Sequence, residues 1–211
     1  MEQKSETRWR RRKEARPDEI LAAALESFAE RGFAATRLED VAARAGISKG
    51  TLYLYFKSKE ELFKAVVRET LVPNLARIES LAAGFEGPSA LLLERLLLTV
   101  TGVIGSRLGA IPKLVIAEAG NFPDLARFYL DEVVHRGLGL IGRILRRGIA
   151  RGEFRAVDVD HVVFCVIAPV LIAALWKNSL EPHEETGPLD AQALVRAHLD
   201  LLLHGLLADP R

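Results

Sequence analysis

A group of small and polar residues in the first third of the chain is suited to close contact with DNA. Residues 48–51 read Ser-Lys-Gly-Thr, and a helix is predicted to begin there. A helix that starts with such residues can bring its backbone near the edges of the bases, whereas a bulky leucine or glutamate at Gly50 would hold it away. Leu52 and Phe56, four residues apart, predict the inward face of this helix. Lys49, Thr51, Tyr53 and Tyr55 are then left on its other faces.

The elements around this group have the layout of a helix-turn-helix. Thr36 and Glu39 form a Thr-x-x-Glu capping box, which predicts the start of a helix at Thr36. Gly46 ends that helix in the turn Ala45-Gly46-Ile47-Ser48, because glycine tolerates a positive φ angle at little cost. Ser48 is a suitable cap for the next helix. In this layout the second helix inserts its first residues into the major groove of DNA.

Two longer helices are predicted on either side of the helix-turn-helix. Residues 17–32 carry apolar side chains at Ile20, Ala24 and Phe28, and this four-residue spacing forms one stripe. Pro17 suits the first turn of that helix. A second capping box, Ser58 with Glu61, predicts a helix from residue 59 to about residue 83.

The N-terminus is strongly basic. A basic arm attracts the phosphate backbone without reading sequence, and we expect residues 1–16 to be disordered in the free protein. The expected domains are this arm, a DNA-binding domain over residues 17–63 and a larger helical domain over residues 64–211. The basic residues of the arm include Arg8, Arg10, Arg11, Arg12, Lys13 and Arg16.

The remaining chain is helical in pattern, so the predicted fold class is all-α with about nine helices. Val162–Trp176 is too short for a confident membrane span, and Pro169 interrupts it; we expect a cytoplasmic protein with no membrane partner. A single cysteine, Cys165, rules out an intrachain disulfide and a chelating cysteine cluster. The five histidines show no nucleophile–base pattern. No metal, no cofactor and no enzymatic activity are therefore expected.

The segment Arg37–Phe63, RLEDVAARAGISKGTLYLYFKSKEELF, resembles the signature of the TetR family of bacterial regulators. The likeness extends over about Pro17 to Val67. The later stretches FPDLARFYLDEVV and GIARGEF resemble a subgroup with AefR-like C-terminal domains. The resemblance implies a sequence-specific transcriptional regulator with an N-terminal helix-turn-helix domain. It also implies a C-terminal domain that binds an effector and dimerises.

Repression is the usual action in the resembled family. A homodimer would bind double-stranded DNA at a palindromic operator. A small hydrophobic effector would release the dimer from the operator by favouring a different arrangement of the two DNA-binding domains. The protein would then be associated with the bacterial nucleoid while it is bound to the operator. The alternative is a helical adaptor that has kept the helix-turn-helix domain but lost DNA binding. The presence of Lys49, Tyr53 and Lys59 disfavours this alternative.

Base reading is assigned by the resemblance to the start of the recognition helix. Lys49 could donate to guanine O6 and N7, and the methyl of Thr51 could touch a thymine methyl. Arg37 could reach a base edge or a phosphate, or could be a solvated arginine. The complete set of implied DNA contacts is Thr36, Arg37, Ser48, Lys49, Gly50, Thr51, Tyr53, Tyr55, Lys57 and Lys59.

Phosphate binding is assigned by the same resemblance to residues on both sides of the recognition helix. Thr36 would bind a phosphate through its side chain and backbone N–H. The alternative is that it serves only as a helix cap, but one hydroxyl and one backbone amide can serve both roles, and both are expected. Tyr53 and Tyr55 would donate their hydroxyls, although one of them could instead pack in the small core. Lys59 matches a phosphate clamp, and Lys57 is a weaker candidate that could be simply solvated.

The dimer surface and the effector pocket are also expected from the resemblance. The dimer helices would lie at about residues 158–178 and 190–207. Their apolar stripes could instead face the chain's own core, and both can hold because these helices are too apolar to have only one buried face. For each pocket residue, an ordinary core or surface position is favoured over a contact with the effector. The dimer candidates are Val162, Val166, Val170, Ala174, Leu194, Leu201 and Leu202. The pocket candidates are Phe122, Phe128, Tyr129, His135 and Trp176.

Overall fold

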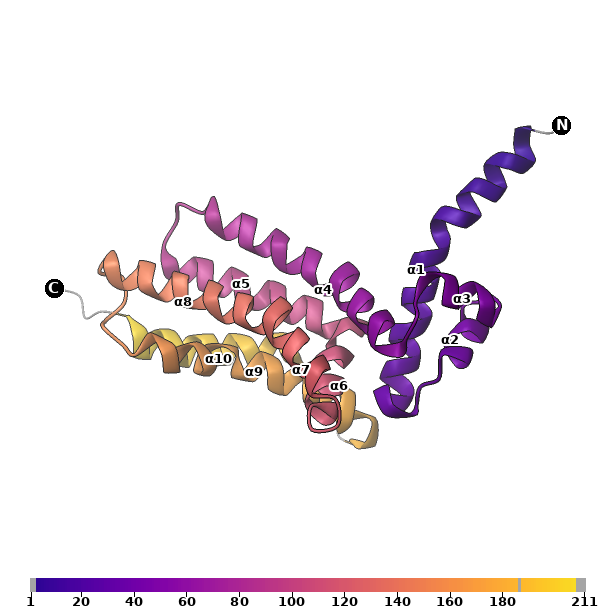
Figure 1. The fold of residues 1–211 in the computed structure, drawn as a ribbon. Coiled ribbons are helices and arrows are strands. Elements are labelled where there is room, and N and C mark those ends of the chain that lie inside the picture. The colour runs from indigo at the N-terminus through magenta and orange to yellow at the C-terminus, as the bar shows by residue number, and fades with distance from the viewer. Residues whose placement is uncertain (1–2, 186, 208–211) are drawn as a thin grey trace. The chain divides into compact units, whose positions relative to one another are not determined.

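The computed structural model describes residues 3–185 and 187–207, with side chains from Pro17 onward, and confirms the all-α class (Figure 1). The only strand-like feature in these ranges is an isolated antiparallel bridge between Phe154 and Leu207. In chain order the α-helices are α1 (Gln3–Ala35), α2 (Leu38–Arg44), α3 (Lys49–Tyr55), α4 (Lys59–Ala83), α5 (Ser89–Gly105), α6 (Ala110–Glu118), α7 (Pro123–Tyr129), α8 (His135–Ala150), α9 (Val159–Ser179) and α10 (Ala191–Leu206).

A π-helical turn separates α7 from α8. The sequence predicts one long helix from about Pro123 to Arg151, and the structure forms α7, the turn Leu130–Val134 and α8 without a gap. Counted as one run, this segment reduces the described helices to the expected nine. A π turn holds one more residue than the α-helical turn it replaces, and such turns are frequent at functional sites.

Helix α1 differs from the prediction at its N-terminal end. Residues 1–16 are expected to be disordered, but α1 begins at Gln3, while residues 1 and 2 lie outside the described part. The segment is rich in arginine, lysine and glutamate, which have high helix propensity. Pro17 therefore lies inside the helix rather than in its first turn. The helical geometry is broken at Gly32, with φ 80° and ψ 168°, where the sequence predicts the end of the helix.

The chain divides into two compact units, and the division falls between Glu69 and Thr70, within α4. The boundary expected from the sequence, between residues 63 and 64, lies in the same helix. Each unit has its own buried apolar side chains, so each is described by itself.

Three phenylalanines form the centre of the first unit. The ring centroids of Phe28, Phe33 and Phe63 are 5.5 to 5.8 Å apart, and Phe63 meets both of the other rings edge-on. This arrangement is favourable because it sets the positive edge of one ring against the negative face of another. Leu52 of α3 is fully buried as well. The core thus packs α1 against α4 and buries the inward face of α3.

The second unit is built around α5, α8, α9 and α10. Its cluster of buried aliphatic side chains includes Leu93, Leu97, Leu145, Val166 and Val195, each with no exposed surface. Burying one such side chain contributes about 1.5–3 kcal/mol relative to leaving it in water. The four helices are therefore held together mainly by the hydrophobic effect.

Gly148 of α8 allows a close contact with Phe154, a member of this buried cluster. A Cβ atom at this position would lie 2.1 Å from Cδ2 of Phe154, whose side chain is buried. We predict that Gly148→Ala lowers the free energy of unfolding by about 1–3 kcal/mol, because the ring cannot keep its place. Urea denaturation followed by circular dichroism measures the change.

Gly137 is a matched control on the same helix. A Cβ atom there would meet nothing within 4 Å. Gly137→Ala is expected to stabilise by up to about 1 kcal/mol, since alanine favours the helix over glycine. Equal stabilities for the two alanine variants would contradict the close approach.

Candidate nucleic-acid interface

The turn between α2 and α3 has the geometry that the sequence predicts. Gly46 has a φ of 66°, the left-handed conformation that glycine adopts without strain. The turn closes through backbone bonds, in which the Gly46 amide donates to Ala43 O at 3.1 Å and the Ile47 amide donates to Ala42 O at 3.0 Å. Leu38 and Val41 on α2 and Leu52 on α3 supply the buried faces. The two helices form a helix-turn-helix.

Ser48 caps the recognition helix α3, as predicted. Its Oγ accepts from the Thr51 amide at 3.1 Å and lies 2.9 Å from the Thr51 hydroxyl. The next glycine, Gly50, is exposed, and a Cβ atom there would meet only Ser48 Oγ, at 3.8 Å. The first turn of α3 is thus capped by Ser48 and sterically open to an approaching surface.

Lys49 lies beside the carboxylate of Glu39, a residue that is absent from the predicted set of DNA contacts. Its Nζ is 2.5 Å from Glu39 Oε1 and 5.7 Å from the centre of the Tyr53 ring. The hydrogen bond to Glu39 raises the pKa of Lys49, and the same bond lowers the pKa of Glu39. Both groups are therefore charged at neutral pH.

Both tyrosines of α3 remain accessible, so neither belongs to the small core. Tyr53 is 40% exposed and Tyr55 is 36% exposed, with the ring of Tyr55 6.5 Å from that of Phe56. Leu54 between them is 85% exposed. An exposed aromatic pair with hydroxyl groups is compatible with phosphate contact.

Thr36 is the one predicted contact whose side chain is buried. The capping prediction is wrong, because the N-cap of α2 is Arg37, which makes no side-chain cap bond. The Thr36 hydroxyl instead shares its proton between Gly32 O at 2.6 Å and Ser27 O at 3.1 Å. Its side chain therefore has no proton left for a phosphate. Arg37 itself is exposed.

The two lysines near the start of α4 differ in their surroundings. Lys59 Nζ donates to Ala34 O at 2.9 Å and lies 4.6 Å from the centre of the Phe33 ring, so it holds α4 against the end of α1. Lys57 is exposed, and its backbone amide donates to Glu61 Oε2 at 2.8 Å. The Glu61 amide in turn donates to Ser58 Oγ at 3.1 Å, which confirms that Ser58 caps the start of α4. The Glu61 carboxylate accepts from the Lys57 amide and not from the Ser58 amide, so the second half of the predicted capping box is displaced by one residue.

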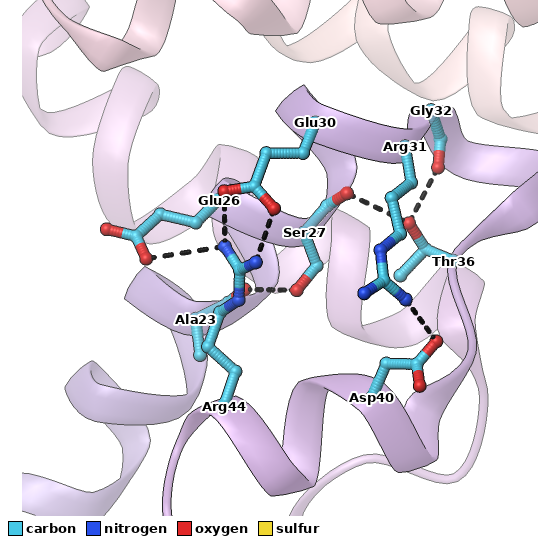
Figure 2. Close-up of polar contacts among 9 residues, drawn as sticks. All are labelled: Ala23, Glu26, Ser27, Glu30, Arg31, Gly32, Thr36, Asp40 and Arg44. Carbon is cyan, nitrogen blue, oxygen red and sulfur yellow. Dashed lines mark hydrogen bonds and ion pairs between the residues drawn. The ribbon is translucent and has the colours of Figure 1, made fainter.

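Ion pairs link α1 to α2 of the helix-turn-helix (Figure 2). Arg44 reaches across to α1, with Nη1 2.8 Å from Glu30 Oε1 and 3.5 Å from Glu26 Oε2. Arg31 of α1 pairs with Asp40 of α2 at 2.8 Å. The hydrogen bond from Arg44 is the main cause of the lowered pKa of Glu30. This network was not predicted from the sequence, although Glu26 and Glu30 stand one turn apart on one face of α1.

Family models match both units of the chain. Residues 20–66 match a model described as bacterial regulatory proteins, tetR family, and residues 92–197 match a model described as Tetracyclin repressor-like, C-terminal domain. Together the two matches cover more than half of the chain. The chain belongs to the TetR family. The helix-turn-helix is therefore the reading head of a DNA-binding transcriptional regulator, while membership of the AefR-like subgroup stays a prediction.

Named relatives of this TetR-family chain are regulators of transcription. The HTH-type transcriptional repressor KstR2 of Mycolicibacterium smegmatis is 32% identical over 200 residues, which cover 91% of each chain. The HTH-type transcriptional regulator RutR of Escherichia coli is 33% identical over 168 residues, covering 73% of this chain and 71% of RutR. These relatives support the regulator interpretation and not the adaptor alternative.

Two solved structures share the fold. The ketosteroid transcriptional regulator KstR2 of Mycobacterium tuberculosis has a TM-score of 0.73 at 28% identity, covering 92% of this chain and 96% of KstR2. FadR from Bacillus subtilis, in complex with stearoyl-CoA, has a TM-score of 0.74 at 24% identity, covering 89% and 97%. At these identities, the likeness to FadR extends to the fold alone.

The predicted effector residues of this TetR-family chain do not share one environment. Phe122, Phe128, Tyr129 and Trp176 are half-buried, and burial raises the pKa of Tyr129. His135 does not line an interior, because its side chain is 64% exposed and lies 3.3 Å from Asp131. It follows the π turn, and its place in the sequence did not reveal which face it would take.

The predicted dimer stripe of α9 is wrong in its choice of face. Val166, Val170 and Ala174 are buried in the core of their own unit, and Val162 packs against that core. The helix is apolar on all sides, so its spacing did not distinguish inside from outside. On α10, Leu202 also packs against the core and Leu194 is half-buried, whereas Leu201 is 74% exposed.

The outward face of α9 carries different apolar residues. Phe164 is 58% exposed and Ile172 is 55% exposed, and Ala168, midway between them, is exposed too. Among the described helices, α9 is the one that is long and apolar enough to cross a membrane, and only 28% of the most apolar stretch is buried within the chain. A large apolar surface on this helix is therefore left without a partner in the single chain.

Proposed function

We propose that this TetR-family regulator is a repressor, which binds a palindromic operator as a homodimer and leaves it when a small hydrophobic effector binds. The observation that carries the DNA-binding part is the open first turn of α3. Lys49 and Tyr53 are exposed beside Gly50, on a helix whose start is fixed by Ser48. In a helix-turn-helix these are the positions that enter the major groove.

The accessible polar groups support a division of the contacts between bases and phosphates. Lys49 can donate to guanine, and Thr51 can offer its methyl to thymine. Hydroxyl and cationic side chains around them suit phosphate oxygens, which fix the register of the head on the duplex. The proposed phosphate contacts are Arg37, Tyr53, Tyr55, Lys57 and Lys59.

The outward face of α9 supports the dimer. Phe164, Ala168 and Ile172 recur every four residues and so form one stripe along the helix. A second copy of the chain would cover this stripe with its own in an isologous interface, and Leu201 of α10 would add to it. Such a pair presents two heads to DNA, which is why the operator is proposed to be palindromic.

The effector is proposed to be hydrophobic, in contact with the half-buried aromatic residues of the second unit. Tyr129 lies next to the π turn, and its raised pKa reflects an environment poor in water. Two relatives by fold have names that mention a ketosteroid and stearoyl-CoA. Stearoyl-CoA and a ketosteroid are therefore suitable first probes, and either would be expected to lower operator affinity if it is accepted.

Operator selection tests the proposal. The purified protein is incubated with a random double-stranded library at about 0.15 M salt, where non-specific phosphate binding is weakened. A palindrome with half-sites about 34–36 Å apart is the expected result. If the folded dimer recovers no motif, the repressor proposal is wrong and the adaptor alternative is favoured. The site of action would be the bacterial cytoplasm, on the nucleoid while the operator is occupied.

A further inference from the structure

Glu39 is a carboxylate on the surface that is proposed to meet DNA. It lies in the first turn of α2, and its Oε1 is 2.5 Å from Lys49 Nζ at the start of α3. The two side chains are 48% and 60% exposed. An ion pair as exposed as this one contributes little to stability. The pair is therefore not required for folding, and its place beside Gly50 points to a role in binding.

A carboxylate so placed would be repelled by phosphates, but it suits one base. Glutamate accepts a hydrogen bond from cytosine N4, and lysine donates to guanine O6 and N7. These donor and acceptor groups lie side by side on the major-groove edge of a single G·C pair. The contact between Glu39 and Lys49 sets an acceptor and a donor at a similar spacing.

The neighbouring groups favour the charged form of both partners. Arg37 lies near enough to lower the pKa of Glu39 further, after the larger effect of the hydrogen bond from Lys49. The Tyr53 ring lies 5.7 Å from Lys49 Nζ, on the same side of α3 as the ammonium group. The acceptor and the donor are thus both charged and already in contact before DNA arrives.

We propose that Glu39 and Lys49 act as one reading unit that selects a G·C base pair in each half-site. Glu39 accepts from the cytosine amino group while Lys49 donates to the guanine of the same pair. An A·T pair is disfavoured because the adenine amino group would replace the guanine O6 that accepts from Lys49, and thymine O4 would replace the cytosine amino group that donates to Glu39. The inference rests on the proposed function, and it adds Glu39 as a specificity-determining residue.

Operator selection followed by binding titrations tests the pair. The wild-type protein is expected to recover a motif with a G·C pair in each half-site, and to lose about tenfold in affinity when that pair becomes A·T. Glu39→Ala, Lys49→Met and the double variant should each discriminate less than about threefold at this position. Because the two residues act together, the double variant should lose no more discrimination between G·C and A·T than either single variant.

Glu19→Ala is the matched control, since Glu19 is an exposed carboxylate of the same unit and its removal changes the net charge equally. It should keep the wild-type preference. A Glu39→Ala protein that folds, binds and retains the full preference would overturn the inference alone, as would a wild-type motif lacking the G·C pair. A wild-type protein that recovers no motif would overturn the proposed function itself.

Discussion

Replacing Gly50 by leucine is expected to reduce operator binding to the non-specific level, a loss of about a thousandfold or more. The leucine side chain would stand on the exposed first turn of α3 and hold the helix backbone away from the base edges. Each hydrogen-bonded base pair that the helix can no longer reach costs about 1–3 kcal/mol, and the whole first turn is affected. Fluorescence anisotropy with the selected operator and with a scrambled duplex measures the decrease in affinity.

The free protein has room for this substitution, so the weaker binding should not come from misfolding. Gly50 has no positive φ, and its Cβ position meets only Ser48 Oγ, at 3.8 Å. The unfolding temperature should therefore stay close to that of the wild type. Gly50→Ala adds a single methyl group and should weaken binding less. A Gly50→Leu protein that binds the operator within threefold of the wild type would rule out close approach at this turn.

Introducing two glutamates on the outward face of α9 is expected to convert the dimer into a monomer. In Phe164→Glu with Ile172→Glu, two carboxylates would be buried without partners at the proposed interface, which is strongly unfavourable. Operator affinity should fall by about 10²–10⁴, because the second head would no longer be tethered to the first. Light scattering gives the mass, and anisotropy gives the affinity.

Ile116→Glu is the matched control, since Ile116 is 54% exposed but lies on α6. This variant should remain a dimer. Both α9 substitutions are at sites more than half exposed in the single chain, so the monomer should keep its helical content. A double variant that is still dimeric would show that another surface forms the interface.

The local sequence was sufficient to predict the reading head. Gly46 needs a left-handed backbone, Ser48 and Ser58 can cap the helices that follow them, and Leu52 marks an inward face. These features depend on residues within one or two turns of each other, so their spacing in the sequence is enough. Lys49 and Tyr53 were found as accessible side chains for the same reason.

Contacts between elements distant in the sequence were decided only by the tertiary structure. Thr36 was predicted as a cap, but folding brings Ser27 O and Gly32 O to its hydroxyl. The pairing of Glu39 with Lys49 crosses the turn, and Arg44 reaches α1. When a side chain has several chemically suitable partners, its actual partner is decided only by the tertiary packing, which sets the distances between them.

The sequence by itself indicated an all-α chain with a helix-turn-helix, because capping and turn residues act locally and the apolar content requires a packed core. Its resemblance to the TetR family implied a DNA-binding regulator. The sequence did not determine which side of α9 faces inward. The spacing of apolar residues in the sequence indicates the buried face of an amphipathic helix, but α9 is apolar on all sides. Only the packing of α5, α8 and α10 against it buries Val166 and leaves Phe164 outside.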